Sequence, residues 1–298
     1  MINVKEIPDQ ELLYGHKACP GCGAAISSRL VMKIIGQRTF LAYPASCIST
    51  VTSIYPQMNF NVPSMTAPFA ATGAVLSGMR AGVNAKGIKN ITILGIAGDG
   101  GTADIGIQSL SGVVERGDDI VYICYDNEAY MNTGVQRSSS TPYGATTTTT
   151  PAGKKSGAIG EQKFKKNLFD IMVAHRISYC ATASIAYPLD FMNKVQKAKD
   201  VKGPAFIQVM APCPTGWGFP SNQTVEIGKL AVQTGLWYLA EYENEKVTIN
   251  IVPKIFKPIE DYLMKQRRFK HLKEKDLAVI REWRDHEWQF IKKRYLNM

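Results

Sequence analysis

The sequence predicts an α/β fold, a mostly parallel sheet flanked by helices, and three stretches support this prediction. Residues 90–98 and 119–127 are continuous apolar, β-branched runs, the pattern of strands buried on both faces of a parallel sheet. Residues 104–117, which lie between them, have helical spacing. A strand, a helix and a second strand in this order indicate a parallel sheet with right-handed crossovers.

The other elements alternate in the same way. Before the first buried strand we expect a helix at 24–35, which Gly36 can end, a short strand at 39–43 and a helix of small residues at 69–83. After the second comes a polar segment, 128–160, without a period, and a loop of this length is usually functional or disordered. The elements expected after this segment are a helix at about 161–175, a strand at 178–183, a helix at about 188–199 and a strand at 205–213.

The last part of the chain, 225–298, is expected to be an α-rich tail. It is basic, because residues 253–298 hold 13 Lys or Arg against 7 Asp or Glu. Its helix near 276–295 places six apolar residues near one face: Leu277, Ile280, Trp283, Trp288, Ile291 and Tyr295. We therefore divide the chain into a main domain, 1–224, and a helical extension, 225–298, which packs on that domain or on a partner subunit.

Composition excludes several classes of protein. Apolar residues make up 45% of the 298 residues and charged residues 20%, which is typical of a globular protein and not of a disordered one. The first 17 residues carry charges without an apolar run, and no stretch approaches the roughly 20 apolar residues that cross a bilayer. We expect a soluble, cytoplasmic protein that makes no contact with a membrane. Its net charge of +10 favours acidic partners, such as a phosphorylated ligand, nucleic acid or an acidic protein.

A first group of polar residues follows the two buried strands. The first strand ends in Gly98, Asp99, Gly100 and Gly101, and glycines there let the backbone approach a phosphate at a helix N-terminus. Asn127 ends the second strand, 28 positions after Asp99, so both side chains are expected at one edge of the sheet. A carboxylate and an amide oxygen beside phosphates suggest Mg²⁺. Alternatively, Gly-Asp-Gly is a strand–helix turn in which Asp99 only caps the helix.

The second group is formed by cysteines. Cys19 and Cys22 form a CxxC pair. Cys47 follows one predicted strand and Cys213 ends another, so both can reach the edge of the sheet where Asp99 lies. A [4Fe–4S] cluster can take its thiolates from distant loops, whereas zinc usually shows two such pairs and a redox pair usually follows a strand. The spacing alone does not decide among an iron–sulfur cluster, a zinc site and a redox pair. Cys124 and Cys180 lie inside predicted strands and are expected in the core.

Taken together these motifs resemble a known family. "GHKACPGCG", a lone Cys47, "GDGGTADIG", "DNEAYMNTG", "TPYGATTTT" and "CPTGW" are similar, in this order, to the β subunit of the 2-oxoacid:ferredoxin oxidoreductases, most closely the pyruvate type. The similarity runs from about residue 14 to 219. It implies a thiamine diphosphate-binding fold in the main domain. The threonine-rich stretch 145–155 is then either a mobile linker or a loop near the active site.

The resemblance also implies the ligand sets. Cys19, Cys22, Cys47 and Cys213 would bind one [4Fe–4S] cluster close to the cofactor. Asp99, the Asn127 side chain and the Ala129 carbonyl would bind Mg²⁺. The backbone from Gly98 to Gly101 would hold the diphosphate of thiamine diphosphate, with Asn127 and Cys47 beside the cofactor. Asn132 would face the thiazolium ring and the substrate as the catalytic residue.

The implied reaction is the oxidative decarboxylation of a 2-oxoacid, pyruvate as first choice, to CO₂ and acyl-coenzyme A, with single electrons passed to ferredoxin. The resemblance implies partners as well. An α subunit would carry the glutamate that activates the cofactor, and γ and ferredoxin-like δ subunits, or fused equivalents, would carry the outer clusters. The chain alone is then expected to be inactive. The basic tail is expected to be a solvated helical face, or else a docking site for ferredoxin or for the phosphates of coenzyme A.

Several alternatives remain at this point. Within the family, the substrate could be oxalate, phenylglyoxylate or a branched-chain 2-oxoacid, because "PASCIST" (44–50) departs from the wording of the pyruvate branch. A non-redox thiamine decarboxylase or synthase subunit would keep Asp99 and Asn127 but have no use for four converging cysteines. A zinc-bearing nucleic-acid-binding protein would explain the cysteines and leave Gly98–Gly101 unexplained; we expect no nucleic-acid partner.

Overall fold

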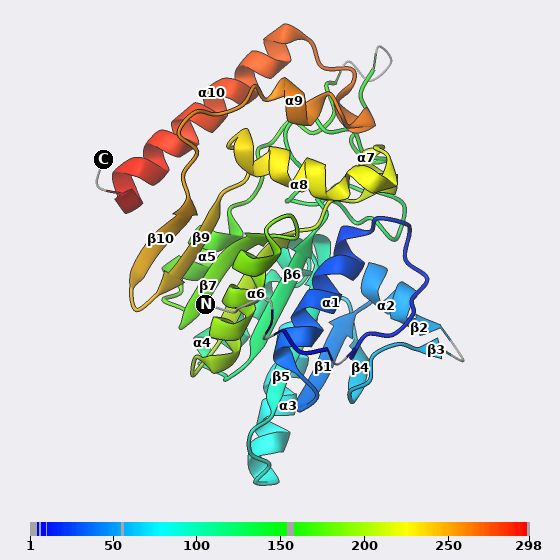
Figure 1. The fold of residues 1–298 in the computed structure, drawn as a ribbon, viewed down its shortest axis with the longest axis vertical. Coiled ribbons are helices and arrows are strands. Elements are labelled where there is room, and N and C mark those ends of the chain that lie inside the picture. The colour runs from blue at the N-terminus through cyan, green and yellow to red at the C-terminus, as the bar shows by residue number, and fades with distance from the viewer. Residues whose placement is uncertain (1–4, 6, 10, 55–56, 154–157, 297–298) are drawn as a thin grey trace.

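The computed structural model of the chain describes every residue except 1–4, 6, 10, 55–56, 154–157 and 297–298. Eight strands of this described part form one sheet (Figure 1). In order across the sheet they are β10 (Lys246–Ile251), β9 (Leu239–Glu243), β7 (Tyr179–Ser184), β8 (Ala205–Met210), β6 (Val121–Asp126), β5 (Thr92–Gly98), β1 (Thr39–Pro44) and β4 (Ser64–Ala67). Two short strands, β2 (Ser53–Ile54) and β3 (Gln57–Met58), pair separately.

The pairing confirms the predicted fold class. The six strands from β7 to β4 pair in parallel, whereas β9 pairs antiparallel with both β7 and β10. All residues of β6, β7 and β8 are buried, as a parallel sheet covered on both faces requires. Cys124 and Cys180 are fully buried inside β6 and β7, so the prediction that both are core residues is also confirmed.

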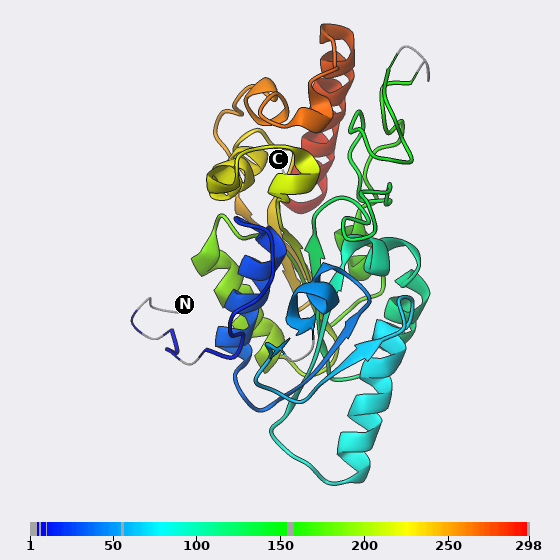
Figure 2. The ribbon, with the colours of Figure 1, turned by 90° about the vertical axis from the view of Figure 1, so that its right-hand side faces the viewer.

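Helices cover both faces of the sheet, so the chain folds in three layers (Figures 1 and 2). Apolar side chains of α1 (Gly23–Ile35) and α6 (Pro188–Asp200) pack on one face. Those of α3 (Thr72–Ala85), α4 (Ile107–Glu115) and α5 (Leu168–Ala174) pack on the other. Each helix presents an apolar stripe to the sheet, and the sheet thereby keeps its parallel strands away from water.

The C-terminal part is mostly helical, as predicted, and holds α8 (Thr224–Gln233), α9 (Glu260–Leu263) and α10 (Glu274–Ile291). Strands β9 and β10 were not predicted from the sequence. They form a hairpin that extends the sheet at β7, and alternate residues of β10 are exposed, so its run of residues lacks the continuous apolar pattern. The boundary at 224/225 stays a prediction.

In α10, Leu277, Ile280, Trp288 and Ile291 are buried on one face as predicted. Trp283 is only half-buried and stacks on the ring of Phe164, with a centroid distance of 4.8 Å. Tyr295 lies beyond the end of α10, in a π-helical turn at Lys292–Leu296, and its hydroxyl donates to Asp170 at 2.7 Å.

Several predicted boundaries differ from the observed ones, such as that of the helix predicted at 69–83, which runs from Thr72 to Ala85, and two further differences lie near the candidate site. The helix expected from about 161 begins at Leu168, where the side chain of Asn167 accepts a hydrogen bond from the Asp170 backbone and caps the helix. The strand expected to reach residue 213 ends at Met210, because Cys213 and Pro214 start the short helix α7 (Pro214–Trp217). The loop predicted at 128–160 holds no helix or strand in its described residues; residues 154–157 lie outside them.

No described helix combines the length and the apolar character that a bilayer span needs. Both views place α7, α8 and α9 beyond the carboxyl ends of the parallel strands, beside the segment that follows β6 (Figures 1 and 2). This end of the sheet carries the residues considered next.

Candidate functional site

The first group lies where β5 ends. Asp99 is fully buried and is followed by a turn of π-helix at Gly100–Asp104. Its side chain makes no capping hydrogen bond to that turn, so the alternative in which Asp99 only caps a helix does not account for it. Gly98, Gly100 and Gly101 line a small cavity, and a Cβ at Gly100 would lie only 2.5 Å from the Tyr130 ring. The glycine run therefore keeps open a narrow space at the strand end.

The end of β6 brings two more oxygens to Asp99. One terminal amide atom of Asn127 lies 3.0 Å from Asp99 Oδ1 and 3.0 Å from the carbonyl oxygen of Ala129. If this atom is nitrogen, it donates to both oxygens. If it is oxygen, three oxygens face one another without a proton between them, and the amide nitrogen points to Cys47 Sγ at 4.0 Å. The second orientation is the one that can hold a cation.

Burial raises the pKa of Asp99 well above its ordinary value, and the neighbouring Asp126 raises it further, while Ser138 and Lys165 lower it. A carboxylate so far from water is costly unless a positive charge compensates it. The group therefore needs either a proton or a bound cation at this position.

Ser138 is a site residue that was not predicted from the sequence. It is fully buried, and its hydroxyl donates to Asp99 Oδ2 at 2.5 Å, which leaves Oδ1 facing Asn127. The only sequence signal is its place in a run of three serines eleven positions after Asn127. Serine runs are common in loops, so this signal is weak.

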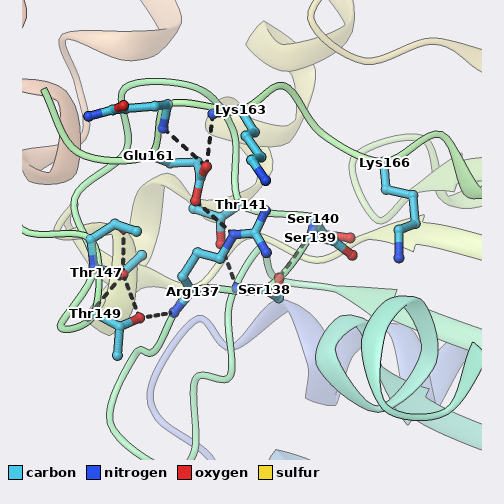
Figure 3. Close-up of polar contacts among 12 residues, drawn as sticks. Arg137, Ser138, Ser139, Ser140, Thr141, Thr147, Thr149, Glu161, Lys163 and Lys166 are labelled. Carbon is cyan, nitrogen blue, oxygen red and sulfur yellow. Dashed lines mark hydrogen bonds and ion pairs between the residues drawn. The ribbon is translucent and has the colours of Figure 1, made fainter.

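The loop around Ser138 is held by polar contacts (Figure 3). Arg137 Nε donates to Glu161 at 2.7 Å, the Arg137 backbone donates to Thr149 at 2.9 Å, and the Ser138 backbone donates to Thr141 at 3.0 Å. Glu161 also accepts from two backbone groups of the segment that was predicted as helix. These contacts explain why that segment is not helical and why Ser138 stays against Asp99.

The second group surrounds a cavity of about 230 Å³. Cys19 and Cys22 lie at the start of α1, Cys47 is the first residue of α2 (Cys47–Thr52), and Cys213 precedes α7. All four line this cavity, and all are free thiols. Cys19 is exposed and the other three are half-buried.

Close backbone contacts bring the CxxC loop to Cys213. Gly21 has a φ of +71°, and a Cβ there would lie 2.1 Å from the carbonyl oxygen of Ser221. Thr224 Oγ1 donates to the Gly21 carbonyl at 2.6 Å, and the Gly23 backbone donates to Pro212 at 3.2 Å. The loop can therefore pack this tightly only with glycine at position 21.

Burial and mutual repulsion favour the protonated form of these thiols. Burial, with smaller contributions from the neighbouring Cys22 and Cys213, raises the pKa of Cys47 to about 12. Burial likewise raises the pKa of Cys213 to about 11, with contributions from Cys22 and Cys19, although a backbone hydrogen bond from Gly216 opposes the rise. In the described chain, however, no three His, Cys, Asp or Glu side chains come close enough to hold one metal ion.

The two groups share a wall. Four residues line both the cavity beside Asp99 and the cysteine cavity: Cys47, Asn127, Met131 and Asn132. Asn132 is exposed, and its Oδ1 accepts from Thr50 at 3.1 Å. The structure thus brings together all the residues predicted for the site, Gly98 to Gly101 included. Their roles toward a cofactor stay predictions.

The comparisons with known proteins agree with this geometry. The family model "Thiamine pyrophosphate enzyme, C-terminal TPP binding domain" matches residues 22–209. Pyruvate synthase subunit PorB of Methanothermobacter marburgensis is 49% identical over 288 residues, which cover 96% of this chain and 99% of that protein. Ketoisovalerate oxidoreductase subunit VorB of Pyrococcus horikoshii is 50% identical over 295 residues, which cover 96% and 94%.

Among solved structures, 2-oxoglutarate:ferredoxin oxidoreductase from Magnetococcus marinus superposes with a TM-score of 0.56 at 22% identity, over 68% of this chain and 67% of that one. At this identity the likeness supports the fold alone. The matches along the sequence confirm the resemblance noted from the motifs, and the nucleic-acid-binding alternative does not fit them. The chain belongs to the thiamine pyrophosphate enzymes and, within them, to the β subunits of the 2-oxoacid:ferredoxin oxidoreductases.

Proposed function

We propose that this chain binds thiamine diphosphate, Mg²⁺ and one [4Fe–4S] cluster, and that with partner subunits it oxidatively decarboxylates a 2-oxoacid to CO₂ and acyl-coenzyme A, with ferredoxin as electron acceptor. One observation carries the proposal: a cavity lined by four thiols shares a wall with the site of Asp99, Asn127 and Ala129, whose polar groups can present three oxygens to a cation. The coenzyme A and ferredoxin that the reaction needs agree with the cytoplasmic location expected from the sequence.

The trio fits Mg²⁺ by its dimensions. Adjacent oxygens of an octahedron with Mg–O distances of about 2.0–2.1 Å lie roughly 2.8–3.0 Å apart. The amide atom of Asn127 is 3.0 Å from Asp99 Oδ1 and from the Ala129 carbonyl. Asp99, Asn127 and Ala129 would therefore supply three ligands, and the diphosphate, held by the backbone of Gly98 to Gly101, would supply others.

The cysteine cavity fits a cluster better than zinc. One zinc ion requires all its ligands around one point, and no described group meets that requirement. Each thiolate of a [4Fe–4S] cluster binds a different iron, so its four sulfurs are spread around a larger body. Cys19, Cys22, Cys47 and Cys213 line one cavity of about 230 Å³, which supports this arrangement. Binding would displace the protons that burial holds on these thiols.

When bound, thiamine diphosphate supplies the electron sink that lets a 2-oxoacid lose CO₂, and the cluster takes up electrons one at a time. The protein positions the two groups. Asn127, with its oxygen toward the cation and its amide nitrogen toward Cys47, would connect both sites. Asn132, on the shared wall and open to solvent, would face the thiazolium ring and the substrate.

Pyruvate is the proposed substrate, because several similar proteins are named pyruvate synthase subunits. A branched-chain 2-oxoacid is the second candidate, because relatives of equal similarity are named ketoisovalerate oxidoreductase subunits. Values of kcat/KM for pyruvate and 2-ketoisovalerate, measured on the complex with coenzyme A and ferredoxin, decide between them. Oxalate and phenylglyoxylate belong in the same assay, where we expect no turnover.

The partners belong to the proposal as well. An α subunit would supply the glutamate that activates the cofactor, and γ and δ subunits would carry electrons outward. The isolated chain is expected to be inactive and to gain activity only with these subunits. Sustained turnover by the isolated chain would contradict this part.

The test is metal and cofactor content. We would purify the chain with its partners in the absence of oxygen and measure iron, acid-labile sulfide, zinc, magnesium and thiamine diphosphate. Close to four irons and four sulfides bound by this chain, with one thiamine diphosphate, is the expected result. If the chain held one zinc and no iron, there would be no electron path and the redox function would be overturned. The thiamine site would then be judged separately, from the measured contents of thiamine diphosphate and magnesium.

A further inference from the structure

Glu128 separates two of the proposed Mg²⁺ ligands, and its backbone conformation is unusual. It has a φ of +65°, in the left-handed region that side chains other than glycine rarely occupy. The side chain of Asn127 and the carbonyl of Ala129 flank it and meet at a distance of 3.0 Å. A left-handed residue between them turns the chain back on itself, so that both groups can face Asp99.

Buried charges hold Glu128 in this conformation. Its carboxylate pairs with Lys165 at 2.8 Å and with Arg268, and all three side chains are largely buried. Lys165 also pairs with Asp126 at 2.9 Å, and the Glu128 backbone donates to Asp126 Oδ1 at 3.0 Å. The Glu128 carbonyl accepts from Thr141 at 2.8 Å. Both flanks of Asn127 are thus fixed.

Arg268 reaches the site by a second path. Its guanidinium lies over the Trp217 ring, 3.9 Å from the centroid, and Trp217 Nε1 donates to the Asn127 carbonyl at 2.8 Å. Trp217 ends α7, the helix that Cys213 precedes. The backbone carbonyl of Arg268 accepts from Thr146 at 3.0 Å, which ties the loop after β6 to the same point.

We infer that Glu128, Lys165 and Arg268 form a clamp that keeps residue 128 left-handed and thereby sets the geometry of the cation site. They are positioning residues: none of them lies among the groups that would touch the cofactor. The inference rests on the proposed cation site. It extends that proposal, because Arg268 of the C-terminal extension would help to position the ligands of the cation. It also gives a reason for the strain at Glu128, since such strain persists only where its surroundings enforce it.

The test compares Glu128→Ala with Glu128→Gly in the full chain purified with its partners. Both variants remove the carboxylate that Lys165 and Arg268 share, and both leave the pair of Lys165 with Asp126 in place. They differ in backbone preference, because alanine resists positive φ and glycine does not. The readout is the affinity for Mn²⁺ in the presence of thiamine diphosphate, measured by electron paramagnetic resonance without any 2-oxoacid.

We expect Glu128→Ala to weaken Mn²⁺ binding by roughly tenfold or more, and Glu128→Gly to bind about fivefold or more tightly than Glu128→Ala. Equal affinities for the two variants, whether weak or like the wild type, would overturn the clamp. A wild-type complex that binds no Mn²⁺ with thiamine diphosphate would overturn the cation site itself, and the inference with it.

Arg268→Lys keeps the positive charge but loses the stacking of the planar guanidinium on Trp217. It tests the clamp without a change at residue 128, in case both residue 128 variants misfold. We expect it to weaken Mn²⁺ binding severalfold. The matched control is Arg281→Lys, because Arg281 also pairs with a glutamate of the C-terminal part, Glu260, but lies at the surface. Equal Mn²⁺ affinities in these two lysine variants would count against the clamp.

Discussion

The cation site and the cysteine cavity share a wall but are assembled differently. The three groups of the proposed cation site, Asp99, Asn127 and the Ala129 carbonyl, lie at or just after the ends of two neighbouring strands, β5 and β6, which pair directly. The four thiols come from three segments that lie far apart in the chain, around residues 19–22, 47 and 213. The first site therefore follows from one strand–helix–strand unit, whereas the second depends on loops meeting across the whole sheet edge.

This difference shows where each site is vulnerable. At the proposed cation site the candidate ligands are placed by sheet register, and buried contacts surround them. At the cysteine cavity the positions of the thiols themselves depend on tight backbone contacts, such as that of Gly21 with Ser221. Substitutions should therefore damage one site and spare the other, and the following experiments test that independence.

The largest effect is expected for Asp99→Asn. It removes the only charge among the three oxygens, so we expect the affinity for Mg²⁺ and thiamine diphosphate to fall by more than about a hundredfold. Isothermal titration calorimetry measures this loss, and iron analysis of the same sample should still find close to four irons per chain. Loss of iron together with the cation would show that the two sites are not independent.

Cys213→Ser should have the complementary effect. Loss of one thiolate is expected to bring iron and sulfide from about four per chain to far lower values, with thiamine diphosphate binding retained. Cys124→Ala is the control, because Cys124 is fully buried in β6 and away from the cavity. If both variants kept their iron, Cys213 would not be a cluster ligand.

Ser138→Ala should weaken Mg²⁺ binding by about ten- to a hundredfold, because Asp99 loses the hydrogen bond that orients it. Ser139→Ala is a close control: Ser139 is its buried neighbour, and its hydroxyl has no hydrogen-bond partner among the described residues. Removal of the Ser139 hydroxyl should leave the affinity for Mg²⁺ and the free energy of unfolding nearly unchanged. Equal Mg²⁺ affinities in these two alanine variants, measured by calorimetry, would show that Ser138 does not orient Asp99.

Gly21→Ala should lower the free energy of unfolding by about 2–4 kcal/mol and reduce iron incorporation, because a methyl group would meet the Ser221 carbonyl and φ is positive. Gly87→Ala separates the two causes, since Gly87 also has a positive φ, +65°, but nothing lies within 4 Å of its added Cβ. It should cost only about 1 kcal/mol and leave the iron content unchanged. Denaturant unfolding compares the two stabilities.

The smallest effect is expected far from both sites, at Glu241. Burial raises the pKa of Glu241, but hydrogen bonds from Lys197, Asn250 and Tyr179 outweigh this and hold it below the ordinary value. The resulting stability is present above the pKa of an unfolded glutamate, about 4.3, and is lost as pH falls through the lower folded-state pKa. Glu241→Gln should thus be less stable than wild type at neutral pH, and the difference should shrink in acid.

Denaturant titrations at neutral and acidic pH measure this difference, and the exposed Glu245→Gln is the control. A gap that stayed constant with pH would show that the ionised form of Glu241 is not the stabilising one. Neither Glu241→Gln nor Glu245→Gln should change cation or iron binding. The values measured for these two variants therefore serve as the reference for the variants at the two sites.

Much of the fold was predictable because the buried strands of a parallel sheet are continuous apolar runs, which can be recognised in the sequence. The runs at β5 and β6 are continuous and apolar, and the 28 positions from Asp99 to Asn127 span one crossover unit. Strand β10 was missed because half of its residues face solvent. The start of α5 was misplaced because the preceding residues are held by Glu161 rather than by helical bonds.

By itself, the sequence determined the α/β class, the two buried strands and the residue types gathered at their ends. It also contained the motifs that resemble the family, since chemistry of this kind requires particular residues at particular spacings. Only the tertiary structure decided that Ser138 orients Asp99, that Glu128 is left-handed, and that Arg268, 140 positions later, reaches it. Contacts between distant segments leave no period or spacing in the sequence, because they depend on how the packed elements bring those segments together.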